Sequence, residues 1–401
     1  MNRAKQTVAM LIVCQALAAT SMTLLFTVAA LVGRELSANP ALATLPLALL
    51  QLAVMAATIP ASLLMQRVGR SLGFGVGTVI GMVGAGLGAI AIFVKSFPLF
   101  CLATVLVGVF NGFSGFYRFA AADAAEDSFR AQAISLVVAG GVVAAVLGPN
   151  LANVSKDWFP NAAFVGSFLA IVVLQLLALP LLALVKIPQP LPSEQQTIGR
   201  SLSQISQQPT FRVAVLGSMV GYGVMALLMT ATPLAMVAIA HPFHSAASVI
   251  QWHVLGMFAP SFFTGFLIAR FGVLTIVLCG VLLNLACVGI NLAGTSVEHF
   301  HIALTLLGLG WNFMFVGSST LLTETYIPTE EAKTQAMHDF LMMGFVALST
   351  FLSGQLLEQL GWGAVNLASL PLLLAVLVAV LWLMRSRLRS TVRSPLSRSA
   401  R

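Results

Sequence analysis

Charged residues are scarce in this chain, and that scarcity limits its class. Only 12 of the 401 residues are Asp or Glu, and charged residues make up 8% of the total. A soluble globular domain carries roughly 25%, so a soluble fold is excluded. The four cysteines, at positions 14, 101, 279 and 287, have no spacing typical of a zinc site or a disulfide framework. The sequence also lacks a phosphate-binding glycine loop, an H-E-x-x-H motif and a nucleophile motif, so it does not predict an enzyme or a bound cofactor.

Apolar sequence takes the place of charge. Hydrophobic residues make up 59% of the chain, and its mean hydropathy is +0.97. A helix needs about 20 apolar residues to cross a bilayer. Twelve runs of that length predict an all-α membrane protein with twelve transmembrane helices. They lie near residues 7–33, 42–65, 73–94, 97–118, 130–154, 161–186, 212–240, 246–269, 273–294, 299–322, 335–357 and 362–384.

The basic residues predict the orientation of these helices. With the N-terminus in the cytoplasm, all but three of the 20 Lys and Arg residues, namely Arg34, Lys95 and Lys156, fall on the cytoplasmic side. Because Lys and Arg are enriched in cytoplasmic loops, we expect both termini there. The arginines of residues 385–401 are better explained by contact with lipid headgroups than by binding of nucleic acid. The expected partner is therefore the lipid bilayer.

The chain repeats itself about its middle. Residues 62–69 correspond to residues 265–272 at an offset of 203, and Asn111 corresponds to Asn312 at an offset of 201. A stretch rich in Pro, Ser and Gln separates the copies. We expect an N-terminal six-helix half over residues 1–186, a cytoplasmic linker over 187–211, and a C-terminal six-helix half with a basic tail over 212–401.

The loops after the second and eighth predicted helices resemble the signature loop of the major facilitator superfamily, G-x-L-x-D-R-x-G-R. The acid of that pattern is Gln66 in the first loop and Ala269 in the second, which weakens the expectation of the usual charge latch. The resemblance implies two halves that rock about a central cavity lined by helices one, four, seven and ten. The gating-loop residues that keep the pattern are Arg67, Gly69, Arg70, Arg270 and Gly272.

Two pairs of soft side chains occupy neighbouring predicted helices. Met225 and Met229 form an M-x-x-x-M pair, and His253 and Met257 form an H-x-x-x-M pair. Four-residue spacing places each pair on one helix face. Thioether and imidazole ligands favour Cu(I) over hard cations. Counted back from a turn near Phe243, Met229 and Met257 lie near the depth of the bilayer midplane, where transporters bind their substrates, with Met225 deeper and His253 shallower.

This quartet resembles the motifs of the CcoA-like copper importers, bacterial proteins related to the riboflavin importers. The resemblance implies a symporter or antiporter in the bacterial inner membrane that brings copper, as the ion or a small complex, into the cytoplasm. There it would supply assembly of a cbb3-type cytochrome oxidase, through a cytoplasmic copper acceptor whose identity the sequence leaves open. Copper is a transported substrate in this interpretation.

Other interpretations stay open. Methionine is a common gap-filler in packed cores, and a buried histidine can be held by hydrogen bonds within the helix bundle. The alternative function is import or export of an organic solute, either a riboflavin-like compound or a drug, coupled to protons. A copper sensor with a transporter fold is a third hypothesis.

A second H-x-x-x-M pair lies near the cytoplasmic start of helix eleven. His338 and Met342 share a helix face, and Asp339 lies beside them. This cluster is compatible with metal release, with proton coupling, or with a helix start stabilised by its acid. Arg118 and Asp123, after helix four, are interpreted as interfacial structure rather than as a substrate clamp.

Overall fold

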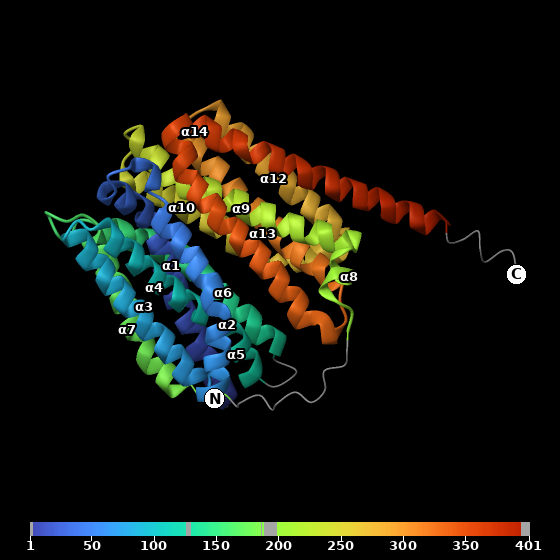
Figure 1. Cartoon of the computed structure of the whole chain (residues 1–401), viewed down its shortest axis with the longest axis horizontal. Coiled ribbons are helices and arrows are strands. Elements are labelled where there is room, and N and C mark those ends of the chain that lie inside the picture. Colours follow the sequence, from blue (N-terminus) through green and yellow to red (C-terminus); the bar gives the residue numbers. More distant parts are fainter. Residues whose placement is uncertain (1–2, 126–129, 186, 188–198, 394–401) are drawn as a thin grey trace, which may run out of the picture.

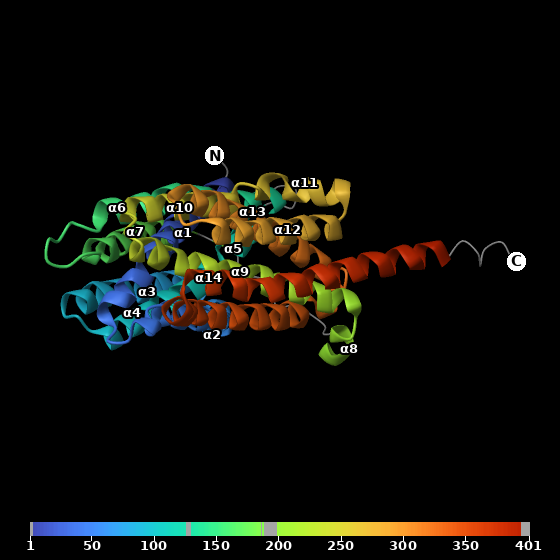
Figure 2. The ribbon, with the colours of Figure 1, turned by 90° about the horizontal axis from the view of Figure 1, so that it is seen from above.

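The structure is a computed structural model that describes residues 3–125, 130–185, 187 and 199–393. Every regular element in these ranges is a helix, which confirms the all-α prediction. Figure 1 shows α1–α7, in blue to green, on one flank and α9–α14 on the other. Figure 2 shows the same bundle from above, with the end of α14 projecting beyond it.

The first flank begins with a long helix and a short 3-10 turn. Pro40, Pro46 and Pro98 each stand in the first turn of a helix, where a missing N–H costs nothing. The elements are α1 (Arg3–Leu36), η1 (Pro40–Leu42), α2 (Leu45–Val68), α3 (Arg70–Phe93), α4 (Phe97–Ser114), α5 (Tyr117–Ala124), α6 (Arg130–Ser155) and α7 (Val165–Leu184).

The second flank begins with a short helix whose N-terminus is stabilised by a capping box. The Ser201 hydroxyl accepts from the backbone N–H of Gln204, and the Gln204 side chain accepts from the Ser201 N–H. The elements are α8 (Leu202–Ser206), α9 (Pro209–Ala238), α10 (Phe243–Phe258), α11 (Ser261–Phe271), α12 (Val273–Ala293), α13 (Val297–Thr323), η2 (Pro328–Glu330) and α14 (Glu331–Arg393).

The predicted membrane segments map onto these helices. In the described residues, nine helices are each long and apolar enough to cross a membrane, and the pair α10–α11, bent by 44°, makes a tenth. One of the nine, α14, contains both the eleventh and the twelfth predicted segment, with a kink at Gly361 between them. The described apolar part of α6, Ala139–Ser155, overlaps the fifth segment and ends one residue beyond it.

Buried side chains gather separately on the two flanks. One core cluster draws on residues 205–383 with Ala145, and the other two draw on residues 8–185 with Leu234. The boundary between the halves stays a prediction, and residue 186, with residues 188–198 of the predicted linker, lies outside the described residues. Arg200, a described residue of the predicted linker, forms an ion pair with Glu330 at 2.7 Å.

The two signature loops have the same backbone. Gly69 has φ 87° and ψ 156°, and Gly272 has φ 86° and ψ 147°. Each ends one helix and begins the next, so the sequence repeat is also a repeat of conformation. The region that these glycines occupy is essentially closed to residues with a Cβ.

We expect Gly272→Ala to destabilise the protein through backbone strain alone, by about 1–3 kcal/mol. A Cβ built on Gly272 has no atom within 4 Å. Gly265, inside α11, is equally open but helical, so Gly265→Ala is the matched control and should leave stability unchanged or raise it. Thermal unfolding in detergent measures both, and equal melting temperatures for the two variants would contradict the strain argument.

Candidate functional site

A cavity of about 220 Å³ lies between the two flanks of the bundle. Helices α1, α2 and α4 supply its wall from one flank, and α9 and α10 supply it from the other. The lining residues are Gln15, Ala19, Met22, Thr23, Phe26, Gln51, Asn111, Ser114, Tyr222, Met225, Ala226, Met229, Thr230, Val254, Met257 and Phe258.

The internal repeat places equivalent positions of α1 and α9 on this wall. Within each helix the lining residues recur at three- and four-residue steps, as one helix face requires. The offset of 203 residues found in the loops also relates Ala19 to Tyr222 and Met22 to Met225. The loops and the Asn111–Asn312 pair already indicated this repeat in the sequence, and the same comparison along α1 and α9 would have found these lining positions.

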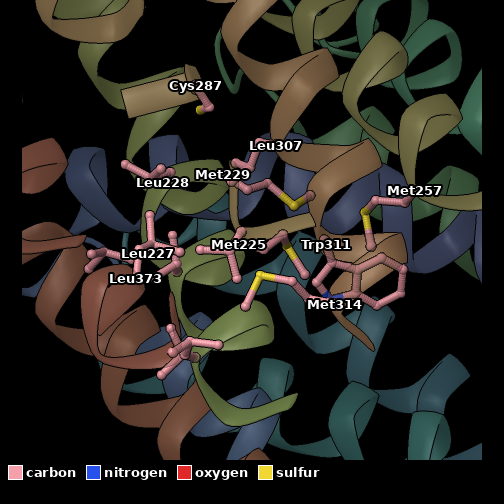
Figure 3. Packing of buried hydrophobic residues seen from close by; sticks show 14 of the residues in the cluster. Met225, Leu227, Leu228, Met229, Met257, Cys287, Leu307, Trp311, Met314 and Leu373 are labelled. Atoms are coloured by element: carbon pink, nitrogen blue, oxygen red, sulfur yellow. The ribbon is translucent and has the colours of Figure 1, made fainter. Parts of the chain in front are cut away.

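Three of the four predicted metal ligands line the cavity. Met225, Met229 and Met257 are all buried and all on the wall, and Figure 3 shows them around Trp311 and Met314. The structure therefore brings the methionine part of the quartet to one site.

The fourth predicted ligand, His253, is fully buried but is not among the cavity-lining residues. Its Nδ1 lies 2.8 Å from the carbonyl oxygen of Leu304 in α13. Because a carbonyl only accepts, Nδ1 carries the hydrogen, and Nε2 is buried without a partner in the described part of the chain. The ring is thus anchored to the α10–α13 contact.

Amide, hydroxyl and aromatic groups complete the wall, and none of the described lining residues is charged. The amides come from Gln15, Gln51 and Asn111, with the Ser114 hydroxyl 3.3 Å from the Asn111 Oδ1. This arrangement offers hydrogen bonds to a neutral polar ligand and no counter-charge to an ionic one.

An aromatic cluster that the sequence analysis did not identify stands behind the wall. The Tyr222 ring meets Trp311 edge-on, with centroids 5.4 Å apart, and Trp311 stacks on Phe315 at 5.0 Å. The Trp311 Nε1 is buried without a partner among the described residues. Phe26 and Phe258 add two more rings on the wall itself.

The predicted set of lining helices needs one correction. Helices one, four and seven correspond to α1, α4 and α9, and all three line the cavity. Helix ten, α13, contributes no described lining residue, and its Trp311 contacts Tyr222 and Phe258, which do line the cavity. Residues of α2 and α10 take its place.

Asn312 of α13 binds the break between α10 and α11. Its Nδ2 donates to the Met257 carbonyl and to the Ser261 hydroxyl, both at 2.7 Å. Its Oδ1 accepts from the Thr264 hydroxyl at 2.7 Å. Within a membrane, carbonyl groups freed by a helix break need such partners. Asn312 therefore holds the bend that directly follows the cavity-lining residues Met257 and Phe258.

Contacts between the flanks close the end of the bundle that holds η1. Arg34 pairs with Glu358 at 2.8 Å, and the Gln355 amide donates to the Ala41 carbonyl at 2.7 Å. The Thr44 hydroxyl also donates to the carbonyl of Phe351 at 3.1 Å. These contacts hold the two flanks together at the end of the bundle that is predicted to face the periplasm.

The predicted cluster in helix eleven is divided by burial. His338 and Met342 are buried, whereas the Asp339 side chain is exposed and accepts from the His338 Nδ1 at 2.9 Å. Neither buried residue is among those that line the cavity.

In the signature loops, Arg70 forms an ion pair with Asp123 of α5, which supports the interfacial interpretation of that acid. The arginine therefore finds its acid outside the loop, whose own acidic position is Gln66. Arg67 and Arg270 are exposed.

Comparison with known proteins places these features in a family. The Major Facilitator Superfamily profile matches residues 11–237 and 219–400. The riboflavin transporter RfnT of Brucella anthropi is 41% identical over 380 residues, which cover 94% of this chain and 96% of RfnT. Two MFS-type transporters of Bacillus subtilis are also similar: YdeG is 30% identical over 89% of this chain and 86% of its own length, and YddS is 27% identical over 95% and 91%.

We expect Asn312→Ala to loosen the bend at the cavity and to destabilise the protein by roughly 1–3 kcal/mol, since three partners lose a hydrogen bond. Asn366→Ala is the matched control, because Asn366 is equally buried but bonds to Asn291 and Trp362, away from the wall. A cysteine at Met257 reports the bend through its rate of labelling by a water-soluble thiol reagent. Only Asn312→Ala should change that rate; an equal change with Asn366→Ala would contradict the assignment.

Proposed function

The chain belongs to the major facilitator superfamily, and from that premise we propose that this multi-pass membrane transporter carries riboflavin or a closely related neutral flavin. The protein is a transporter and not an enzyme. We further propose that it resides in the bacterial inner membrane with both termini in the cytoplasm, as the distribution of Lys and Arg predicts.

The chemistry of the cavity wall is the observation that carries this proposal. A flavin has a flat fused ring with an amide edge, and riboflavin adds a chain of hydroxyl groups without net charge. The uncharged wall supplies amides from Gln15, Gln51 and Asn111 to pair with that edge and chain. Tyr222 and Phe258 supply rings for stacking. The 41% identity to RfnT supports the same substrate class.

The size of the cavity bears on the transport cycle. Sites for drug-sized ligands are usually about 300–1,000 Å³, and the cavity here has about 220 Å³. A flavin therefore requires the flanks to separate further than they do in this conformation. Rocking of two halves about a central site, the mechanism of this superfamily, supplies that separation.

Copper import is the second candidate, and one observation favours it: Met225, Met229 and Met257 meet at the cavity. Two observations weigh against it. His253, the predicted imidazole ligand, is not among the lining residues, and the relative that is 41% identical is a riboflavin transporter. Methionine also packs well against aromatic rings, so the three side chains suit a flavin as well as a soft metal.

Entrance counterflow in proteoliposomes tests the substrate without assuming a direction or a coupling ion. Vesicles loaded with riboflavin should accumulate labelled riboflavin from outside. Tyr222→Ala should weaken this exchange about 10-fold or more, because stacking on an aromatic ring contributes about 1–3 kcal/mol. Tyr222→Phe, which keeps the ring, is the matched control and should retain most of the exchange.

Replacing all three methionines by leucine separates the two candidate substrates. Leucine keeps an apolar side chain of similar size and removes the sulfur. The triple variant Met225→Leu/Met229→Leu/Met257→Leu should still exchange riboflavin within a few-fold of the wild type. If the wild type instead takes up ⁶⁴Cu(I) and exchanges no riboflavin, and the triple variant loses that uptake, copper is the substrate and the flavin proposal is wrong.

Proton coupling is proposed for the pair His338–Asp339, whose side chains share a hydrogen bond of 2.9 Å. The exposed carboxylate of Asp339 is accessible to protons, and its bond to His338 links its charge state to a buried ring. Asp339→Asn should therefore flatten the dependence of uptake on pH. Glu331→Gln is the control, because Glu331 is an exposed acid eight residues before Asp339 in the same helix. This variant should keep the wild-type pH profile. Unchanged profiles for both variants would reduce Asp339 to a helix-start residue.

A further inference from the structure

A second hollow lies far from the central cavity, on the outer surface of the bundle. It has a volume of about 220 Å³ and lies between the start of α9 and the last part of α14. We call it the outer groove. Its lining residues are Pro209, Arg212, Val213, Leu216, Ala379 and Trp382.

The outer groove has an apolar floor and a cationic rim. Val213, Leu216 and Ala379 form the floor, and the described lining residues include Arg212 as their single charged group. Arg212 is exposed, and its Nε donates to the Ser206 carbonyl at 3.0 Å, which leaves the two terminal nitrogens of its guanidinium directed away from that bond. An apolar slot that ends at an arginine matches a molecule with one hydrocarbon part and one anionic part.

The end of α14 brings two more arginines toward the same rim. Arg385 and Arg389 follow Trp382 by three and seven residues, so they share its helix face. Both are exposed. Arg387 is instead paired with Glu324 at 2.7 Å and also donates to the Thr210 hydroxyl, at the start of α9, at 3.3 Å. None of the described groove-lining residues is an acid that could neutralise Arg385 or Arg389.

The position of the outer groove along the helix axis fits a membrane surface. α9 begins at Pro209, and α14 continues past the last apolar segment and projects out of the bundle (Figures 1 and 2). Trp and Arg are the side chains that collect where a membrane helix meets the headgroups. Arg212 and Trp382 thus mark the level of the predicted cytoplasmic leaflet.

We propose that the outer groove is a binding site for one anionic phospholipid of the cytoplasmic leaflet. One acyl chain lies along Val213, Leu216 and Ala379, and the phosphate is held among Arg212, Arg385 and Arg389. Arginine binds phosphate through paired N–H groups, which favours it over a lysine for such a site. Basic pockets between membrane helices on the cytoplasmic side are suited to anionic headgroups. The proposal does not depend on the identity of the transported solute.

Native mass spectrometry of the full-length protein in detergent tests the charge requirement, with phosphatidylglycerol as the probe and phosphatidylethanolamine as the comparison lipid. The wild type should retain one tightly bound phosphatidylglycerol. The variant Arg212→Gln/Arg385→Gln/Arg389→Gln should bind it on the order of 100-fold more weakly, at roughly 1 kcal/mol for each charge. The matched control is Lys5→Gln/Arg67→Gln/Arg270→Gln, which removes three exposed cations from the same predicted face.

A second variant tests the groove without altering charge. Ala379→Trp fills the floor and keeps all three arginines, so it should also remove the tightly bound lipid. Melting temperatures of all variants establish that each one is folded. Equal losses in the groove variant and its control would show diffuse attraction and overturn the site. Unchanged binding in Ala379→Trp, or equal retention of phosphatidylethanolamine by the wild type, would overturn it as well.

Discussion

The architecture depends on one constraint: a backbone carbonyl within a membrane must find a hydrogen-bond donor inside the protein. Where α10 breaks from α11, helical bonding is interrupted, and Asn312 supplies donors to the Met257 carbonyl and to Ser261. Met257 and Phe258, which line the cavity, form the last turn of α10 immediately before the break. A helix that ran straight would not need this amide. The same residue, Asn312, therefore bonds the backbone at the bend and holds α10 where its residues line the site.

The two halves use one scaffold for different chemistry. At the offset of 203, Thr23 corresponds to Ala226, Phe26 to Met229, and Gln51 to Val254. The first half thus presents more amide and hydroxyl groups, and the second presents more thioether and alkyl groups. A cavity with one polar and one apolar side orients an asymmetric ligand, because only one placement satisfies both walls.

Hydropathy and repetition predicted most of the fold, because membrane helices are specified by length and apolar content and the loops by glycines at Gly69 and Gly272. Counting residues predicted a common depth for Met229 and Met257, and both line the cavity. The rotation of each helix did not follow, since an almost uniformly apolar helix has no polar face to mark its orientation. For that reason the sequence could not predict that His253 contacts Leu304. Nor could it predict that Trp311 of α13 contacts Tyr222 and is not among the described lining residues.

The methionines illustrate why a motif and a wall can support different functions. A Cu(I) site needs two or three soft ligands converging on one point. The predicted imidazole ligand, His253, instead donates from Nδ1 to the Leu304 carbonyl, and its Nε2 is not on the described cavity wall. A flavin needs polarizable groups spread along a flat ring together with donors at its edge. Met225, Met229 and Met257 lie on the wall with Tyr222 and Phe258, and the amides of the first half lie across from them. These groups are spread over a larger area than a single ion can contact. The composition of the wall therefore favours an extended aromatic substrate.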